Sequence, residues 1–491
     1  MPRTISPLTR PISGTLEVPG DKSISHRYAI LAALAEGRTE IANFSTAQDC
    51  QSTLECLKRL GVRIEAVAAP SGAANPSGAI HPATLPPDQP AVETANLLTI
   101  HGRGLNGLRG SFRALDAGNS GTTMRLLAGA LAGQHFNSKI TGDTSLRRRP
   151  MGRVIAPLRE MGADIQANDG ELAPLRIRCC GLRPMGYSLP LASAQVKSAI
   201  LLAGLFADGW TTVRESAATR DHTEIALREF GAEVRLLPGV ASVRGIARLK
   251  PLSLRVPGDF SSASFFIGAA LMHPGSELLI SNVGLNPTRT ALLDVLAEWG
   301  AQPRVVSVQM IAGELVGSLL IRHAPLSGGI ISGSQIPKLI DELPLLAALG
   351  PYTEQGIEIR DARELRVKES DRIAALAAGL ASMGARVEEF PDGLRVLGRA
   401  SVQSGACAPM EEFSGRLAGL ASVQSGAGAS PVGVSPLHGA ELDSRDDHRI
   451  AMALSIAALG ASGDSVIRDP ECVAASFPEI FALLESITRV S

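Results

Sequence analysis

The chain has 491 residues, of which 45% are hydrophobic and 19% are charged, and its formal net charge is −1. This length predicts at least two domains, because one hydrophobic core rarely serves so long a chain. The balanced charge and an aromatic content of 3% argue against a nucleic-acid partner. The sequence has no long apolar run that would predict a membrane span. The six cysteines form no C-x-x-C pair, which argues against a metal site and favours a cytoplasmic protein.

One short pattern recurs along the chain: the end of a helix, usually a glycine, and the start of a strand. Glycine ends each helix because it readily adopts a left-handed conformation, and β-branched residues then open a strand. The copies are LKRLGVRI from Leu57, LREMGADI from Leu158, LREFGAEV from Leu227, LAEWGAQP from Leu296, LASMGARV from Leu380 and a degraded LLESITRV from Leu483. The pattern predicts six α/β units of roughly 70 residues each.

Two stretches lengthen the spacing between copies and are expected to be flexible insertions. One is a Pro/Gly/Ala-rich segment at about 68–92, and the other, at about 400–440, repeats ASVQSGA from Ala400 and from Ala421. A longer-range duplication, V-P-G-D from Val18 and again from Val256, divides the six units into two halves. The two phrases are therefore expected to mark corresponding places in two domains.

Several predicted helices carry a cation at or near their first turn, where the helix dipole disfavours positive charge by roughly 0.3–1 kcal/mol. These residues are Lys22, Arg27, Arg125, Arg372 and Arg449. A repeated cation at a helix start predicts an anionic ligand between them, bound also by free backbone N–H groups. The alternative for any single one is a solvated or salt-bridged surface residue.

Two acidic residues lie among these bases. Asp341 and Glu369 should stay ionised beside the cations, and either could accept a proton from a substrate hydroxyl. The alternative is that both are helix caps or members of ordinary ion pairs.

These motifs resemble those of the 5-enolpyruvylshikimate-3-phosphate (EPSP) synthase family over nearly the whole chain. The resemblance is specific because many motifs occur in the same order, and two of them, ASAQVKSA and TRDHTE, resemble the class II branch. The matching segments are PGDKSISHR, LDAGNSGTTMR, GDTSLRRRPMGR, ASAQVKSAILLAGL, TRDHTE, PGDFSSASFF, NPTRT, IDELP, RVKESDR, DDHRIAM and SFPEI.

The resemblance implies an α/β fold, a two-domain inside-out α/β barrel in which each domain has three βαβαββ repeats. The upper domain would comprise residues 1–20 plus 257–491, and the lower domain residues 21–256. The implied reaction moves the enolpyruvyl group of phosphoenolpyruvate to the 5-hydroxyl of shikimate 3-phosphate and releases phosphate. It needs no metal and no cofactor, and the family suggests a cytoplasmic monomer whose partners are these two anions.

The resemblance also implies a set of site residues. Asp341 would be the base at the 5-hydroxyl, and Glu369 with Lys22 would handle the proton on the methylene carbon. Shikimate 3-phosphate would be held by Lys22, Ser23, Arg27, Ser193, Ala194, Gln195, Arg220, Asp341 and Lys368. Phosphoenolpyruvate would be held by Lys22, Gly121, Arg149, Gln195, Arg372 and Arg449, and arginine suits that role by bidentate pairing with carboxylate and phosphate.

Two alternatives and two departures accompany this interpretation. UDP-N-acetylglucosamine enolpyruvyl transferase shares the fold and the donor, and a non-catalytic sugar-phosphate-binding relative would share the scaffold. Ala475 stands where many relatives carry a lysine that contacts phosphoenolpyruvate. Gly121 stands where glyphosate-tolerant class II relatives carry alanine, and glyphosate, a longer molecule, occupies the phosphoenolpyruvate subsite in this family. We therefore expect this chain to be more glyphosate-sensitive than those relatives.

Overall fold

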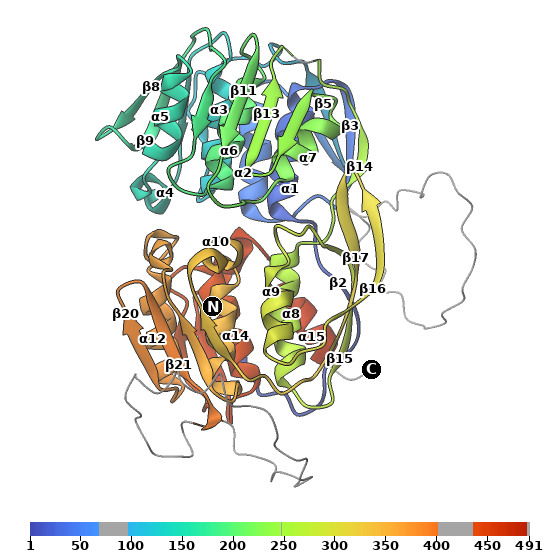
Figure 1. Ribbon diagram of the computed structural model, residues 1–491, viewed down its shortest axis with the longest axis vertical. Helices are drawn as coiled ribbons and strands as arrows, with labels where there is room; N and C mark the ends of the chain where they lie inside the picture. The colour runs from blue at the N-terminus through green and yellow to red at the C-terminus, as the bar shows by residue number, and fades with distance from the viewer. Residues whose placement is uncertain (68–96, 247, 401–435, 489–491) are drawn as a thin grey trace, which may run out of the picture.

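A computed structural model describes residues 1–67, 97–246, 248–400 and 436–488, so most of both expected insertions lies outside the described residues. The chain forms two lobes stacked along the long axis of the molecule (Figure 1). We call the lobe built from residues 21–256 the first lobe, drawn uppermost, and the other the second lobe.

The first lobe contains three four-stranded sheets. Their strand orders are β14 (Ser253–Arg255), β3 (Glu36–Ala42), β5 (Leu97–Arg103), β4 (Arg63–Val67); β6 (Leu115–Asp116), β7 (Ser138–Thr141), β9 (Leu172–Arg178), β8 (Asp164–Asn168); and β10 (Gly186–Ser188), β11 (Trp210–Arg214), β13 (Val240–Arg244), β12 (Val234–Leu237). The helices are α1 (Lys22–Leu34), α2 (Gln48–Arg59), α3 (Gly121–Ala132), α4 (Thr144–Arg148), α5 (Gly152–Glu160), α6 (Ala194–Gly204) and α7 (His222–Glu229).

The second lobe contains two four-stranded sheets and one three-stranded sheet. Their orders are β16 (Arg304–Ile311), β17 (Glu314–Arg322), β15 (Glu277–Gly284), β2 (Ser13–Glu17); β18 (Gly329–Ile331), β19 (Gly356–Ile359), β21 (Gly393–Leu397), β20 (Val387–Phe390); and β1 (Arg3–Ile5), β23 (Ser465–Arg468), β22 (Glu441–Asp443). The helices are α8 (Phe260–Met272), α9 (Ala291–Glu298), α10 (Ile336–Leu339), α11 (Leu343–Leu349), α12 (Arg372–Ser382), α14 (His448–Leu459) and α15 (Ile480–Thr488).

All four-stranded sheets share one pairing pattern, with a parallel pair at one edge and two antiparallel pairs beside it. The glycines of the first five sequence copies, Gly61, Gly162, Gly231, Gly300 and Gly384, all have positive φ, between 84° and 104°. That conformation ends the helix and turns the chain into the next strand. The repeated sequence pattern is therefore a repeated βαβαββ unit, and the predicted two-domain α/β fold is confirmed.

The helices at the centre of each lobe are buried on all sides, as expected for helices that are apolar all round. Every residue of α8 is buried, and α3 packs against α6 as α11 packs against α14. One hydrophobic core joins buried residues from Ile5–Val18 and Phe260–Ile487, and the other joins residues between Ile24 and Val256. We propose that these cores are two domains, residues 1–20 with 257–491 and residues 21–256.

The two V-P-G-D phrases lie side by side where the chain passes between the lobes. Gly20 and Gly258 form an antiparallel bridge, the N–H of Asp21 donates to the carbonyl of Pro257 at 2.8 Å, and the N–H of Asp259 donates to that of Pro19 at 2.9 Å. The crossing exists because β2 precedes the first lobe in the chain but pairs with β15 in the second. Among the described residues, none of the helices combines the length and apolar content that a bilayer crossing needs.

Candidate active site

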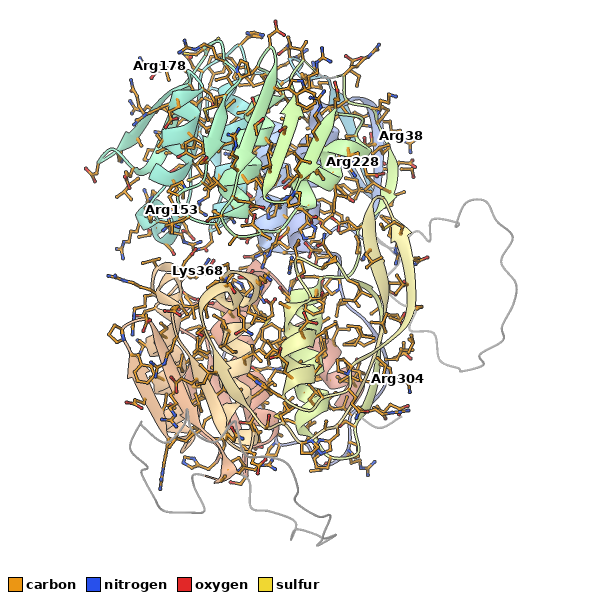
Figure 2. All side chains as sticks on the ribbon, in the orientation of Figure 1. Arg38, Arg153, Arg178, Arg228, Arg304 and Lys368 are labelled. Atoms are coloured by element: carbon orange, nitrogen blue, oxygen red, sulfur yellow. The ribbon has the colours of Figure 1, made fainter. Side chains whose placement is uncertain are left out.

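Polar helix starts from both lobes surround a cavity of about 820 Å³. The first lobe contributes Asn119, Ser145 and Arg149 to its lining, and the second contributes Lys368, Glu369, Asp446, His448, Cys472 and Ala475. Figure 2 shows Lys368 on the edge of the second lobe that faces the first, whereas Arg38, Arg178 and Arg304 lie on outer surfaces. The described residues contain no group of three His, Cys, Asp or Glu side chains that could hold a metal ion.

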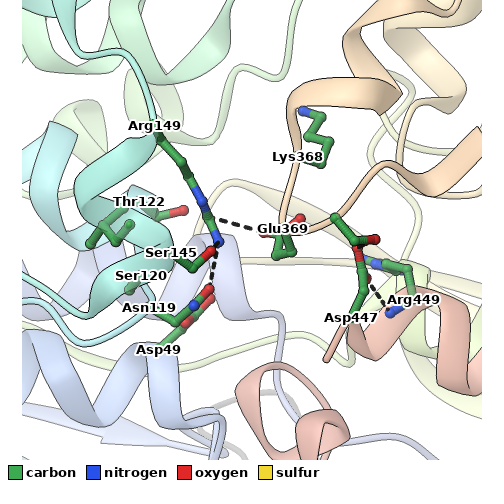
Figure 3. A network of polar contacts seen from close by, with 12 residues as sticks. Asp49, Asn119, Ser120, Thr122, Ser145, Arg149, Lys368, Glu369, Asp447 and Arg449 are labelled. Atoms are coloured by element: carbon green, nitrogen blue, oxygen red, sulfur yellow. Dashed lines mark hydrogen bonds and ion pairs between the residues drawn. The ribbon is translucent and has the colours of Figure 1, made fainter. Parts of the chain in front are cut away.

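Arg149 reaches across the cavity from the end of α4 (Figure 3). Its Nη1 lies 3.3 Å from Oε1 of Glu369, and its Nη2 donates to Oδ1 of Asn119 at 2.6 Å and to Oγ of Ser145 at 3.3 Å. The guanidinium is thus held by its own lobe while its charge faces a carboxylate of the other lobe.

Glu369 lies between several positive charges. Nη2 of Arg372 donates to its second oxygen, Oε2, at 2.5 Å, and Nε of Arg372 donates to Asp447 at 2.8 Å. Burial alone would raise the pKa of Glu369, but the charges of Arg372, Arg149 and Lys368 hold that pKa well below its usual range. Glu369 is therefore ionised.

Asp341, between α10 and α11, pairs with Arg220 of the first lobe. Burial would raise the pKa of Asp341, yet Arg220 and, beyond it, Arg449, Lys368 and Arg372 lower it well below the usual range. Both expected catalytic carboxylates therefore pair with an arginine of the opposite lobe. Each is thus a member of an ion pair, and its catalytic role stays a prediction.

Lys22 is the first residue of α1, and its Nζ lies 2.9 Å from Oδ2 of Asp49. Burial would lower the pKa of Lys22, but Asp49 raises it above its ordinary value, so the lysine is charged. Its positive charge also contributes to a low pKa of His448, about 3, for which burial is the main cause. His448 is consequently neutral.

The remaining first-lobe residues form a connected polar surface. Arg27 lies one turn into α1 rather than at its start; its Nε donates to Thr223 at 2.6 Å, its Nη2 to Ser198 at 2.9 Å, and its Nη1 to the carbonyl of Ser23 at 2.8 Å. Ser193 caps α6 and Ala194 begins it. Burial lowers the pKa of Arg27 to about 10, which leaves it charged at neutral pH.

Gln195 joins α6 to α3. Its Oε1 accepts from Nη1 of Arg125 at 2.7 Å, and its Nε2 donates to Thr122 at 2.9 Å. A Cβ placed on Gly121 would lie 2.7 Å from the same Nη1 and 3.6 Å from Nη1 of Arg149. Gly121 therefore leaves open the space between these two arginines.

Arg449, the second residue of α14, is buried, and its guanidinium carbon lies 5.9 Å from the centre of the Phe265 ring. Its backbone N–H donates to Asp447, the N-cap of α14 (Figure 3). Its Nε has no hydrogen-bond partner within the described parts of the chain. A buried guanidinium with a free donor is suited to an anionic ligand.

Comparisons with known proteins agree with this geometry. The family model for EPSP synthase (3-phosphoshikimate 1-carboxyvinyltransferase) matches residues 8–92 and 90–484. The chain belongs to the EPSP synthase family. A 3-phosphoshikimate 1-carboxyvinyltransferase of Koribacter versatilis is 47% identical, with 97% of each chain covered, and one of Solibacter usitatus is 44% identical, with 100% of each covered. The EPSP synthase of Acinetobacter baumannii has a similar structure, with a TM-score of 0.78, 37% identity, and 99% of this chain and 98% of that chain covered.

The structure brings together most of the residues that the family resemblance implies. Arg149, Lys368 and Glu369 line the cavity directly. The charges of Arg372 and Lys368 lower the pKa of both Asp341 and Glu369, so these four groups form one electrostatic cluster. Nζ of Lys368 lies 3.2 Å from Oε1 of Glu364, so this ammonium forms an ion pair within the second lobe.

Several polar residues of the site were not singled out from the sequence of this EPSP synthase family member. Asp49 forms an ion pair with Lys22. Asn119 and Ser145 accept hydrogen bonds from Arg149, and Asp447 pairs with Arg372. Asp447 and Asn119 lie within motifs that carry predicted residues, DDHRIAM and LDAGNSGTTMR, and adjacency was the available signal. Asp49 follows a helix start with no such motif. At Ala475 the cavity wall is formed by a methyl group, with Cys472 beside it.

Proposed function

We propose that the chain transfers the enolpyruvyl group of phosphoenolpyruvate to the 5-hydroxyl of shikimate 3-phosphate and releases phosphate. The observation that carries the proposal is the pairing of two partly buried carboxylates, each 22% exposed, with arginines of the opposite lobe, Asp341 with Arg220 and Glu369 with Arg149. Each arginine is placed where an anionic ligand could replace the carboxylate as its partner. One chain supplies both halves of the site, and we propose a monomer that works in the cytoplasm.

In the proposed binding mode the first lobe holds shikimate 3-phosphate through Ser23, Arg27, Ser193, Ala194, Gln195 and Arg220, with Lys22, Asp341 and Lys368. Arg27 supports this role because three of its donors are used by the protein, which fixes the plane of its guanidinium. Phosphoenolpyruvate would lie against Gly121, Lys22, Arg149, Gln195, Arg372 and Arg449. The space beside Gly121 and the free Nε of Arg449 support that placement.

The chemical steps follow from the positions of the carboxylates. Asp341 accepts the proton of the 5-hydroxyl while the hydroxyl oxygen forms a bond to C2 of phosphoenolpyruvate. Glu369, with Lys22, supplies a proton to the methylene carbon. The resulting tetrahedral adduct then breaks the bond between C2 and the phosphate oxygen. The leaving phosphate takes up the proton held by Asp341, and the methyl group returns a proton to Glu369, with Lys22, as the double bond re-forms. Atoms balance without a metal or an organic cofactor.

Ligand binding would also tune both carboxylates. The arginines hold the pKa of Asp341 and of Glu369 well below their usual ranges, which suits neither proton acceptance nor donation. When phosphate and carboxylate groups of the substrates neutralise those arginines, the pKa of each side chain rises toward its ordinary value. Substrate binding would therefore bring the pKa of Asp341 and of Glu369 into a range in which they could act as an acid–base pair.

The test is phosphate release by the purified protein with phosphoenolpyruvate and one of two acceptors. Release with shikimate 3-phosphate, and none with UDP-N-acetylglucosamine, is the expected result. Release only with the nucleotide sugar would assign the related transferase activity instead. Binding of shikimate 3-phosphate without any release would indicate a non-catalytic relative.

A further inference from the structure

The loop Asn286–Thr290, NPTRT, has no role in the site described above. It belongs to the second lobe and connects β15 to α9. Two of its side chains, Asn286 and Arg289, are buried, with exposed fractions of 4% and 3%. A buried arginine and a buried amide are costly to keep without polar partners, so the partners that they do have are informative. Nε of Arg289 has no partner among the described residues, whereas both of its terminal nitrogens do.

Arg289 joins the two aspartates of the duplicated V-P-G-D phrase. Its Nη1 lies 3.1 Å from Oδ2 of Asp21, its Nη2 lies 3.4 Å from Oδ1 of Asp259, and the same Nη2 donates to Oγ of Ser261 at 2.6 Å. Asp21 caps α1 and Asp259 caps α8, each by accepting from a backbone N–H. One guanidinium thus fixes the start of a helix in each lobe, and α1 is the helix that begins with Lys22 and Ser23.

Asn286 holds a second helix start of the first lobe. Its Nδ2 donates to Oδ1 of Asp221 at 2.8 Å and to Oε2 of Glu314 at 3.0 Å. The other oxygen of Glu314 lies 2.7 Å from Nδ1 of His222, the first residue of α7. Asp221 and His222 directly follow Arg220, so these contacts control where the Arg220 side chain begins.

The two held helices meet at Arg27. Arg27 projects from α1 and donates to Thr223 of α7, two residues after Asp221. Residues of the second lobe therefore determine the relative placement of Ser23, Arg27 and Arg220, although all three belong to the first lobe. A shift of about 1 Å in such a binding set is enough to cost about 100-fold in rate.

We propose that Asn286 and Arg289 are positioning residues for the shikimate 3-phosphate subsite. This inference rests on the proposed function. The side chains of Asn286 and Arg289 pair with Asp221, Glu314, Asp21, Asp259 and Ser261, none of which is proposed to bind a substrate. They act by holding the starts of α1 and α7 against the second lobe at the point where the chain crosses, which gives a role to the aspartate in both copies of the phrase.

The experiment compares Asn286→Ala, Arg289→Gln and Arg289→Lys with the wild type. The matched control is Arg322→Gln, which removes an arginine–carboxylate pair with Glu277, 2.6 Å long, in the sheet of the same lobe. For each protein we would measure KM for both substrates, kcat, the affinity for shikimate 3-phosphate by calorimetry, and the Tm. Thermal stability alone would not separate positioning from ordinary stabilisation.

We expect KM and Kd for shikimate 3-phosphate to rise by about 5- to 50-fold in Asn286→Ala and Arg289→Gln, within the range of coupling through one polar network. KM for phosphoenolpyruvate should rise by a smaller factor than KM for shikimate 3-phosphate, because Lys22 is the only proposed phosphoenolpyruvate residue on α1 or α7, whereas Ser23, Arg27 and Arg220 all lie on or directly beside these helices. Arg289→Lys keeps the charge and should restore part of the affinity. The control should bind as the wild type does.

Unchanged affinity for shikimate 3-phosphate in the folded variants, with a lower Tm, would show that the loop only stabilises the fold. Equal rises in KM for both substrates would also overturn the proposal. If Arg289→Gln does not fold, Asn286→Ala and Arg289→Lys decide the question. Failure of the wild type to release phosphate would instead refute the proposed function, so the two failures are distinguishable.

Discussion

Gly121→Ala should separate inhibitor binding from substrate binding at the phosphoenolpyruvate subsite. The added Cβ would lie 2.7 Å from Nη1 of Arg125, so that nitrogen must move by about 0.7 Å to reach an ordinary contact of 3.4 Å. Because the nitrogen is the end of a flexible side chain, it can move, but it also donates to Gln195 at 2.7 Å. The methyl group thus narrows the space beside Arg149 and loosens Gln195.

The folded state should tolerate this change. Gly121 begins α3 with a helical backbone, and alanine is favoured over glycine in helices by up to about 1 kcal/mol. We expect an unchanged or slightly higher Tm and a KM for phosphoenolpyruvate raised by about 3- to 10-fold, or roughly 0.7–1.4 kcal/mol. Glyphosate is longer, so its inhibition constant should rise by a factor at least about 10 times larger, another 1.4 kcal/mol or so.

Steady-state phosphate release measures both constants in one assay. Gly129→Ala, in the same helix, is the contrasting variant, because its Cβ would lie 2.2 Å from the carbonyl oxygen of Ala199 in the packing of α3 on α6. Overpacking of that kind costs about 1–3 kcal/mol, so its Tm should fall without selective loss of inhibition. Equal factors for KM and the inhibition constant, or a wild type indifferent to millimolar glyphosate, would refute the reasoning.

Three further predictions test the site, its charges and the insertion. Asp341→Asn should retain binding of shikimate 3-phosphate in calorimetry but lower kcat by about 10²–10⁴-fold, the range for one acid–base group; near-normal turnover would move the role to Glu369. His448 has a folded pKa of about 3, below its unfolded value of about 6.5, so the unfolded chain binds the extra proton and stability is lost as pH falls below about 6.5. His448→Gln should flatten the fall of Tm between about pH 6.5 and 4.5, and an unchanged profile would contradict the burial argument. Deletion of 403–436, most of which lies outside the described residues, should leave a folded, active enzyme, since loop length costs only about 0.6 kcal/mol per doubling; loss of soluble, active protein would show that the segment contributes to folding.

Much of the fold could be predicted from the sequence because its repeat is local. A helix end, a glycine and a strand start lie within eight residues, and Gly61 and Gly384 adopt the same left-handed conformation in different lobes. The sheet partners of the strands at the chain crossing could not be predicted from such local patterns. That β14 completes the sheet of β3, and β1 that of β23, depends on pairings between residues far apart in the chain.

The same distinction between local and long-range features applies to the candidate site. Lys22 and Arg372 stand at the first residue of their helices, as the motif positions predict, because caps and helix starts are set by neighbouring residues. The pairing of Arg149 with Glu369, 220 positions apart, could not be predicted, since it exists only once two lobes face each other. Arg27 and Arg125, predicted at or near helix starts, lie one turn into α1 and α3, where their length lets them reach Ser23 and Gln195.

In the proposed mechanism, the cross-lobe ion pairs would contribute to specificity. Each pair holds an arginine and a carboxylate where a substrate anion and a reacting proton are proposed to lie, so the two charges neutralise each other. A ligand with one anionic group can release only one pair, and the other carboxylate then keeps its low pKa. On this proposal, two anions together would be needed to free both Asp341 and Glu369 for proton transfer. Premature reaction with either substrate alone is therefore disfavoured by electrostatics rather than by shape.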